Sequence, residues 1–478
     1  MSAQESSSIM PESTSPAKVD PTFASALVDH LDTGDLDSAL ALVAELHPAD
    51  LARLAHRMPR EYVTKLLMAL PVETGADVLA AWEEEYSAEI LGDVPPEHLA
   101  PLLNELESDD AADVLGQMDA SVVPHVLPAL EDSEAIRNLL EYDAETAGGI
   151  MATEYVAVPM HWTVAEATEE VRRNAETVEE IYVIFAVDEA GRLNGFVSLK
   201  RLLLSPSSAL IEYVMRKDIH FVTPDIDQEE VVRIMERYDL VSLAVVDEAH
   251  QLIGRVTIDD AIDVIREEAE EDYQRLSGIT GDEEPTDSIV RITRGRLPWL
   301  LLGMIGAAIA GSVIGVFEES IRRVSVLASF IPVVMAMAGN AGIQSSAIIV
   351  QGLASGDVWS ANMLRRLGKE VLVAAVNGIA LAVAMALVVV LVFMAGAGIW
   401  PDVVLAAPEP VRLAATAGMS LFVVVLLAAA IGVSIPLVLH RAGIDPALAT
   451  GPFITTSNDI IGLVVFFTLA TLLYLPFL

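Results

Sequence analysis

Residues 297–317 read LPWLLLGMIGAAIAGSVIGVF, a run without a single Asp, Glu, Lys or Arg. A helix of about 20 apolar residues is long enough to cross the hydrocarbon core of a bilayer. Four further apolar stretches follow, at 324–356, 371–401, 413–439 and 446–478. No stretch of this kind comes before residue 297. The sequence therefore predicts an all-α membrane domain of five transmembrane helices over residues 297–478, preceded by a region that stays outside the membrane.

The charge of the chain is confined to its first three-fifths. The 478 residues include 28 basic and 69 acidic side chains, a net charge of −41, although 53% of the residues are hydrophobic. Residues 291–478 hold 10 basic and 8 acidic side chains, so the net charge of residues 1–290 is −43. Such a field attracts cations and repels phosphates, which favours metal ions as partners and excludes nucleic acid. The absence of cysteine excludes disulfides, thiolate metal sites and cysteine nucleophiles.

Basic residues near the ends of the apolar stretches predict the orientation of the chain. They lie before the first stretch (Arg291, Arg294, Arg296), between the second and third (Arg365, Arg366, Lys369) and after the fourth (His440, Arg441). Because basic loops stay on the cytoplasmic side, we expect a multi-pass protein of the cell (inner) membrane with its N-terminal region inside and its C-terminus outside. Residues 1–24 lack the features of a signal peptide and are predicted to be a disordered tail.

Residues 25–145 predict a cytosolic α-helical domain. Segments such as PREYVTKLLMAL at 59–70 and PVETGADVLAAW at 71–82 place Leu and Val at helical spacing and begin with proline. The spacing of about a dozen residues recurs, which is typical of a superhelical repeat. The chain contains no Ser-His-Asp arrangement, glycine-rich phosphate loop or HExxH motif, so we expect no enzymatic activity.

Residues 146–264 contain a second internal repeat. IYVIFAVDEAGRLNGFVSLKRLL at 181–203 is similar to VSLAVVDEAHQLIGRVTIDDAI at 241–262, at a constant offset of 59 residues. Each half has an amphipathic helix (164–173 and 228–238), then two strands joined by an acidic turn, then a closing helix. This pattern resembles a tandem pair of CBS motifs, an α/β sensing module that usually binds adenine nucleotides.

The two halves differ at the position that holds the nucleotide ribose in such motifs. The second half has Thr257-Ile258-Asp259-Asp260, whereas the first has Ser198-Leu199-Lys200-Arg201 and lacks the acid. The resemblance therefore implies at most one nucleotide site, for ATP or another adenine nucleotide, at Thr257 and Asp260. The sequence leaves open whether that site binds a nucleotide.

Residues 265–296 are assigned to an acidic connecting helix that leads into the membrane. Residues 259–272 hold eight acidic side chains and one Arg at helical periodicity. Such a charge run is often only a solvated face. Here, repulsion among these carboxylates would change the conformation of the helix region when divalent cations bind and neutralise them. Carboxylate oxygens are the ligands that Mg²⁺ and Ca²⁺ prefer.

Two predicted membrane helices carry polar patches. The second contains AGNAGIQSS at 338–346, and the fifth contains TTSND at 455–459. An Asp at the centre of a bilayer costs at least about 2.5 kcal/mol, so Asp459 is expected to face a watery cavity or a partner group. The alternative is a protonated Asp459 bonded to a neighbouring helix. Asn340 and Gln344 could equally serve only to join helices.

The order of these parts resembles the MgtE-type magnesium transporter family from about residue 35 to the end of the chain. The junction YDAETAGGIMATEYVAVP at 142–159 and the pattern Asp445-Pro446-Ala447, Gly451-Pro452 and Thr455-Thr456-x-x-Asp459 are similar to that family. The chain departs from the family pattern at Ile343, where an Asn is common.

The resemblance implies a homodimer in the lipid membrane that conducts Mg²⁺ inward through a channel-like pore and closes when cytosolic Mg²⁺ binds. It implies pore ion-binding positions at Asp459, Asn340, Thr455 and Thr456. It also implies cytosolic Mg²⁺-sensing positions at Asp77, Asp109, Asp113, Asp227, Glu229, Asp239, Asp260, Asp263, Glu268, Glu271 and Asp272. Two alternatives remain: a membrane-anchored nucleotide or ion sensor that conducts nothing, and a transporter whose main substrate is Co²⁺, Mn²⁺ or Ca²⁺.

Overall fold

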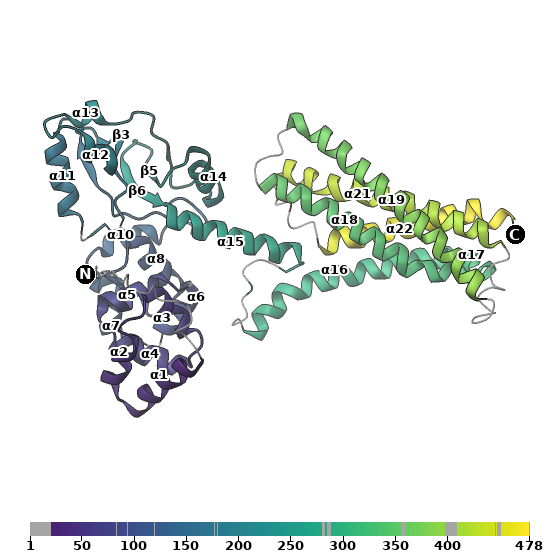
Figure 1. Cartoon of the computed structure of the whole chain (residues 1–478), viewed down its shortest axis with the longest axis horizontal. Coiled ribbons are helices and arrows are strands. Elements are labelled where there is room, and N and C mark those ends of the chain that lie inside the picture. Colours follow the sequence, from purple (N-terminus) through teal and green to yellow (C-terminus); the bar gives the residue numbers. More distant parts are fainter. Residues whose placement is uncertain are drawn as a thin grey trace, which may run out of the picture. The chain divides into compact units, whose positions relative to one another are not determined.

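The computed structural model of the chain describes residues 21–478 except 83, 93, 119, 176, 179, 280–282, 284–287, 355–359, 397–408, 445, 447–450 and 478. Most of the predicted tail, and most of the 445–450 part of the family pattern, lie outside the described residues. The chain divides into two compact units, Met1–Arg266 and Glu267–Leu478, and each is described by itself (Figure 1).

The first unit begins with a stack of short helices. They are α1 (Pro21–Thr33), α2 (Leu36–Val43), α3 (Pro48–Ala55), α4 (Arg60–Ala69), α5 (Val72–Ala80), α6 (Glu84–Leu91), α7 (Pro96–Leu103), α8 (Ser108–Gln117), α9 (Val123–Val126) and α10 (Ser133–Leu139). Helix α5 packs between α3 and α7, and α6 packs between α4 and α8. Alternate helices therefore form two layers, which confirms the predicted helical repeat domain.

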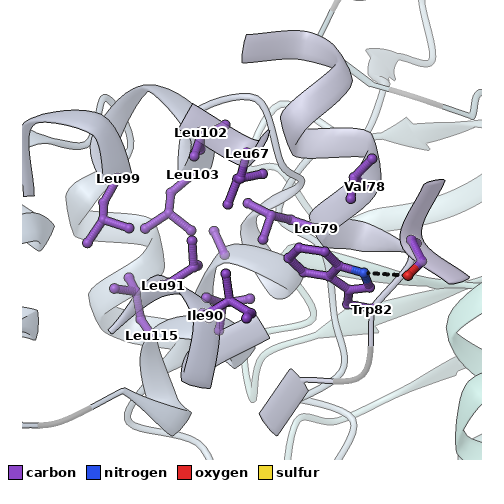
Figure 2. Close-up of a cluster of buried hydrophobic side chains, with 14 of the residues drawn as sticks. Leu67, Val78, Leu79, Trp82, Ile90, Leu91, Leu99, Leu102, Leu103 and Leu115 are labelled. Carbon is purple, nitrogen blue, oxygen red and sulfur yellow. Dashed lines mark hydrogen bonds between the residues drawn. The ribbon is translucent and has the colours of Figure 1, made fainter. Parts of the chain in front are cut away.

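A leucine-rich core holds these two layers together (Figure 2). Leu79, Leu91 and Leu103 are almost completely buried, and their side chains come from α5, α6 and α7. The indole Nε1 of Trp82 donates a hydrogen bond to the carbonyl of Ala52 at 3.1 Å. Burial of these side chains is the main source of stability, because each large apolar side chain contributes about 1.5–3 kcal/mol when it leaves water.

The second part of this unit contains two three-stranded sheets. Its elements are β1 (Ala157–Pro159), α11 (Val164–Arg173), β2 (Val183–Val187), β3 (Leu193–Ser198), α12 (Leu199–Leu204), α13 (Ile211–Val214), β4 (Phe221–Val222), α14 (Gln228–Tyr238), β5 (Ser242–Val246) and β6 (Leu252–Thr257). Each sheet pairs its first two strands in parallel and its last two antiparallel. The predicted helices 164–173 and 228–238 are confirmed to the residue, as is the α/β repeat.

After β6, the described residues form seven helices. They are α15 (Ile258–Leu276), α16 (Ile289–Val316), α17 (Glu318–Arg323), α18 (Ile331–Ala354), α19 (Ser360–Gly396), α21 (Pro410–Arg441) and α22 (Pro452–Leu473), and short 3-10 turns flank α18 and α22. Within the described residues, five segments are long and apolar enough to cross a membrane: Ile289–Val316, Ser325–Leu353, Leu367–Met394, Pro410–Arg441 and Phe453–Phe477.

Two of these helices begin earlier than the apolar pattern indicates. Helix α16 includes Arg291 and Arg294, and α19 includes Arg365 and Lys369, although the sequence placed all four residues before the membrane spans. Charged residues indicate where the hydrocarbon core of the bilayer ends. They do not indicate where the backbone hydrogen bonds of the helix end. A helix can continue past the membrane surface, where long basic side chains reach the interface.

Helices α18, α21 and α22 pack against one another, while α16 contacts α22 and α19 contacts α21. The shared core contains Leu463, Phe466, Phe467 and Tyr474 of the last helix and its C-terminal cap, all almost fully buried. Glycines let the backbones approach closely, which is how membrane helices gain contact without a hydrophobic driving force. A Cβ on Gly418 would lie 2.7 Å from the Ala382 carbonyl oxygen, so α19 and α21 require glycine there.

Candidate functional site

A buried acidic cluster lies where the helical domain meets the second CBS motif. Asp109, in the first turn of α8, is 5% exposed. Its pKa is raised well above the ordinary value, first by burial and then by the nearby carboxylates of Asp260, Asp110, Glu107 and Asp113. The structure thus brings together three predicted positions, Asp109, Asp113 and Asp260, that are up to 151 residues apart in sequence.

Asp260 is held in place by the residue that begins its own motif. The backbone N–H and the hydroxyl of Thr257 both donate to Asp260 Oδ2, at 2.9 and 2.6 Å. Burial raises the pKa of Asp260, the two bonds from Thr257 oppose that rise, and Arg255 also opposes it. The Thr-x-x-Asp spacing therefore builds a fixed carboxylate whose charged form is disfavoured, so a cation placed here would be stabilised.

A clasp of hydrogen bonds and one ion pair surrounds this cluster, and sequence reasoning did not find it. Arg255 Nη2 of β6 pairs with Glu107 Oε1 at 2.8 Å, and the Arg255 side chain is 4% exposed. The N–H and hydroxyl of Ser108 donate to Glu154 Oε2 at 3.2 and 2.8 Å, and the Thr153 N–H donates to Ser108 Oγ at 2.9 Å. We call these five residues, Glu107, Ser108, Thr153, Glu154 and Arg255, the interdomain clasp.

The repeat offers a signal that would have found Arg255. Strand register pairs Phe185 with Phe196 in the first half and Ala244 with Arg255 in the second, so Arg255 occupies the position of Phe196. An Arg at a strand position that is apolar in the sister repeat indicates a charged partner from outside the sheet. Glu107 is that partner.

Three predicted positions lie at the two ends of α14. Asp227 caps the N-terminus by accepting from the Glu229 N–H at 2.9 Å, and Glu229 pairs with Arg233 at 2.9 Å. Asp239 ends the helix in the left-handed region with φ 51°. Eleven helical residues separate the two ends by about 16 Å, so Asp227 and Asp239 cannot share one ion within this chain.

The remaining predicted acids lie on α5 and α15. Asp77 of α5 is exposed, and exposed Asp263 pairs with Arg266 at 3.1 Å. On the later part of α15, Glu271 pairs with Arg275, and Glu268 and Asp272 are partly buried. Among the residues that the structure describes, no group of three or more Asp, Glu or His side chains is arranged to hold a metal ion.

The two polar patches of the membrane domain lie side by side. A Cβ on Gly339 of α18 would lie 3.3 Å from Thr455 Cγ2 and 3.8 Å from Asp459 Oδ1 of α22. Asp459 Oδ1 is buried and has no hydrogen-bond partner among the described residues. Asn340, next to Gly339, is exposed on the surface of this single chain. Thr455, Asp459 and the backbone before Asn340 thus form one neighbourhood.

The other polar residues of these helices have different surroundings. Thr455 Oγ1 donates to the Gly451 carbonyl at 3.1 Å. Thr456 faces the opposite neighbour, since a Cβ on Gly306 of α16 would overlap its methyl group. Gln344 and Ile343 are both exposed, so the amide that the family pattern would place at 343 is not needed for packing inside this chain.

Comparison with protein families matches three separate parts of the chain. Residues 331–469 match MgtE, described as a divalent cation transporter. Residues 46–145 match the MgtE intracellular N domain, and residues 147–207 and 211–267 each match the CBS domain.

Individual relatives cover nearly the whole chain. The magnesium transporter MgtE of Bacillus subtilis (strain 168) is 33% identical over 92% of this chain and 95% of its own length. The magnesium transporter MgtE of Thermus thermophilus is 33% identical over 94% of this chain and 98% of its own length. A crystal structure of the cytosolic domain of the Mg²⁺ channel MgtE in complex with ATP is 37% identical, with a TM-score of 0.48, over 50% of this chain and 99% of that one.

Proposed function

We propose, because this chain belongs to the MgtE family of magnesium transporters, that it conducts Mg²⁺ down its electrochemical gradient into the cytoplasm. The observation that carries the proposal is the neighbourhood of Gly339, Thr455 and Asp459, where a carboxylate oxygen is buried without a hydrogen-bond partner among the described residues of the membrane domain. A membrane potential contributes about 2.3 kcal/mol per elementary charge per 100 mV, so inward Mg²⁺ flux requires no ATP hydrolysis.

The chemistry of the patch suits an ion that keeps its water. Mg²⁺ loses its hydration shell reluctantly and is commonly bound through one or two carboxylates plus waters. Asp459 supplies one charge, Thr455 lies beside the same Gly339, and Asn340 is the next residue after that glycine. We propose that a second copy of the chain faces this surface, because Asn340 and Gln344 would otherwise expose amides to lipid. The homodimer places two Asp459 side chains around one path.

We further propose that cytosolic Mg²⁺ closes this path through the acidic cluster. Asp109 and Asp260 raise each other's energy when both are charged, and a bound cation removes that penalty. Each ion that binds only the closed arrangement stabilises it by RT ln(1 + [Mg²⁺]/Kd), so several weak sites together produce a steep response. The further candidate positions are Asp77, Asp113, Asp227, Glu229, Asp239, Asp263, Glu268, Glu271 and Asp272.

A nucleotide is the second proposed ligand of the cytosolic part. Thr257 and Asp260 form the only pair of the two repeats that carries both the hydroxyl and the acid. Because Asp260 lies beside Asp109 and Glu107, the phosphates of ATP would meet negative charge unless Mg²⁺ accompanies them. Isothermal titration with ATP, with and without Mg²⁺, tests this pair, and Asp260→Asn is the control variant.

Uptake into proteoliposomes that contain the full-length protein tests the transport proposal. We expect Mg²⁺ entry driven by an inside-negative potential, with Co²⁺, Mn²⁺ and Ca²⁺ competing more weakly than added Mg²⁺. Stronger competition by one of these ions would identify it as the main substrate. Vesicles with correctly folded dimers and no flux of any divalent ion would instead support a membrane-anchored sensor.

Proteolysis of the connector tests the closing mechanism. Full-length protein with Asp260→Asn, Asp263→Asn and Glu271→Gln together should lose the Mg²⁺-dependent change in cleavage of α15. If its protection followed that of the wild type across millimolar Mg²⁺, these acids would have no part in closing. The matched control is Glu318→Gln with Glu319→Gln, which removes two exposed acids of α17 that already pair with Arg322 and Arg323.

A further inference from the structure

Asn458 is the most deeply buried polar side chain of the last membrane helix. It is 1% exposed, and neither its Nδ2 nor its Oδ1 has a hydrogen-bond partner in the part of the chain that the structure describes. Because it is already enclosed within a single chain, a second copy cannot reach it. An unpartnered amide in a membrane domain is costly, so its position calls for a reason beyond filling space.

The amide lies at the point where three helices meet. A Cβ on Gly342 of α18 would overlap Asn458 Nδ2 and would lie 3.1 Å from Asn458 Cγ and 2.9 Å from Ile454 Cγ2. From the other side, a Cβ on Gly432 of α21 would overlap the Gly342 carbonyl oxygen. Gly342 therefore has no side chain because the Asn458 amide takes that place. The Asn458 side chain of α22 thus packs into the space that the missing side chain of Gly342 leaves on α18.

The next turn of the same pair of helices carries the proposed pore carboxylate. Gly339 lies beside Thr455 and Asp459, just as Gly342 lies beside Ile454 and Asn458. Consecutive residues of an α-helix point about 100° apart, since 3.6 residues complete one turn. Fixing the direction of Asn458 at Gly342 therefore fixes the direction in which Asp459 points.

We propose that Asn458 is a positioning residue, whose amide, seated at Gly342, sets the rotation of α22 and so aims the Asp459 carboxylate. The expected effect on transport rests on the proposed function of Asp459. The expected effect on the direction in which residue 459 points does not rest on that function. A misplacement of about 1 Å at a reacting group can reduce a rate by as much as 100-fold, so a small rotation of α22 is enough to matter.

Adding side-chain volume at Gly342 and removing it at Asn458 tests the proposal. Gly342→Ala adds a methyl group where the Asn458 amide lies, and should lower Mg²⁺ uptake by roughly tenfold or more. Asn458→Ala in the same protein removes the overlap and should restore a large part of the uptake. The control is Gly462→Ala on the same pair of helices, whose added Cβ would meet Ala338 Cβ at 3.2 Å without overlap and should change uptake by less than about twofold.

A labelling experiment measures the direction of position 459 without relying on transport. The chain has no cysteine, so Asp459→Cys introduces its only thiol. Its rate of reaction with a water-soluble thiol reagent should change when Gly342→Ala is added, and should return toward the starting rate when Asn458→Ala is added as well. If Gly342→Ala prevents folding, Asn458→Ala alone should change the labelling rate at position 459, because α22 then loses the contact of its Asn458 side chain with Gly342.

Unchanged labelling in folded Gly342→Ala and Asn458→Ala proteins would overturn the proposal, as would failure of the second substitution to reverse the first. Labelling that changes as expected, combined with uptake that does not depend on Asp459, would leave the positioning role standing and reject the proposed pore. Failure of the positioning role of Asn458 is therefore distinguishable from failure of the pore role of Asp459.

Discussion

The interdomain clasp and the membrane patch both bury polar side chains, but they satisfy them differently. In the clasp, Arg255 meets Glu107, and Ser108 meets Glu154, at ordinary hydrogen-bond distances. In the patch, the Asn458 amide and Asp459 Oδ1 have no partner among the described residues. The carboxylates of the clasp are paired within one chain, although Arg255 Nε has no hydrogen-bond partner among the described residues, whereas the patch leaves its carboxylate oxygen and its amide without partners there.

This difference indicates that the clasp and the patch have different roles. A buried network whose members pair with one another specifies one arrangement of two domains. A buried group without a protein partner is available to a ligand, and hydrated Mg²⁺ supplies hydrogen-bond donors to a carboxylate. Breaking the clasp should therefore change how the domains dock, and changing the patch should change transport. Substitutions in and around the clasp separate these two roles.

Arg255→Met should have the largest effect on docking. It leaves the partly buried Glu107 without its cation, and breaking a fully buried ion pair costs about 3–5 kcal/mol, which is the upper bound here. We expect faster hydrogen exchange of the amides of α8 in the full-length protein, measured by mass spectrometry. Exchange at the wild-type rate would show that the ion pair does not hold the domains together. Arg266→Met, which removes the cation of an exposed pair, is the matched control.

The acidic cluster should make docking depend on pH. The pKa of Asp109 is raised by burial and then by Asp260, so the folded form binds a proton that the unfolded form has lost. The unfolded state then binds fewer protons, and stability falls as the pH rises from the ordinary Asp pKa toward the raised one. In Mg²⁺-free buffer, lowering the pH from about 8 to about 5 should raise the protection factors of the α8 amides, which are exchange rates divided into the intrinsic rate at each pH.

Asp109→Asn should weaken this pH dependence, because an amide stays neutral at every pH and only Asp260 then keeps a raised pKa in the cluster. Protection of the α8 amides should be higher than in the wild type at the higher pH and should respond less to Mg²⁺. A variant that keeps the wild-type slope would show that another group titrates.

Ser108→Ala should have a moderate effect. It removes the hydroxyl that donates to Glu154 and accepts from the Thr153 N–H, and a hydrogen bond of this kind contributes about 0.5–1.5 kcal/mol, or more when a charged group is left unsatisfied. Exchange should quicken in α8 and at residue 153, by less than in Arg255→Met. An effect as large as that of Arg255→Met would place the hydroxyl, and not the ion pair, at the centre of the clasp.

Asp263→Asn should have the smallest effect on docking. Its pair with Arg266 is exposed, and pairs of this kind contribute about 0–1 kcal/mol. Exchange in α8 should match the wild type without Mg²⁺. A change as large as that in Asp109→Asn would show that surface acids hold the domains in the same way as buried ones.

Periodicity predicted the elements that depend on local sequence. Helices α11 and α14 and the five membrane helices follow from hydrophobic spacing, and the 59-residue offset predicts the two sheets. The membrane boundaries were less accurate at α16 and α19, because hydropathy reports the edge of the hydrocarbon and helices continue beyond it.

The candidate sites could be predicted only in part, because their contacts join distant residues. Asp459 was singled out by the cost of a charge in the membrane. The seat of Asn458 at Gly342 joins positions 116 residues apart, and no pattern within either segment reports it. Arg255 differs, because comparison of the two repeats singles it out, but its partner Glu107 is 148 residues away and is known only from the structure.

The most direct test of the account is Mg²⁺ uptake by Asp459→Asn in proteoliposomes, compared with the wild type at low Mg²⁺ on the cytosolic side. Asparagine keeps the size of the side chain and removes its charge. If Asp459 lines the ion path, dimers should have normal stability and uptake should fall by about tenfold or more, because the only carboxylate of the patch is gone. Uptake within about twofold of the wild type would contradict the assignment of Asp459 to the ion path.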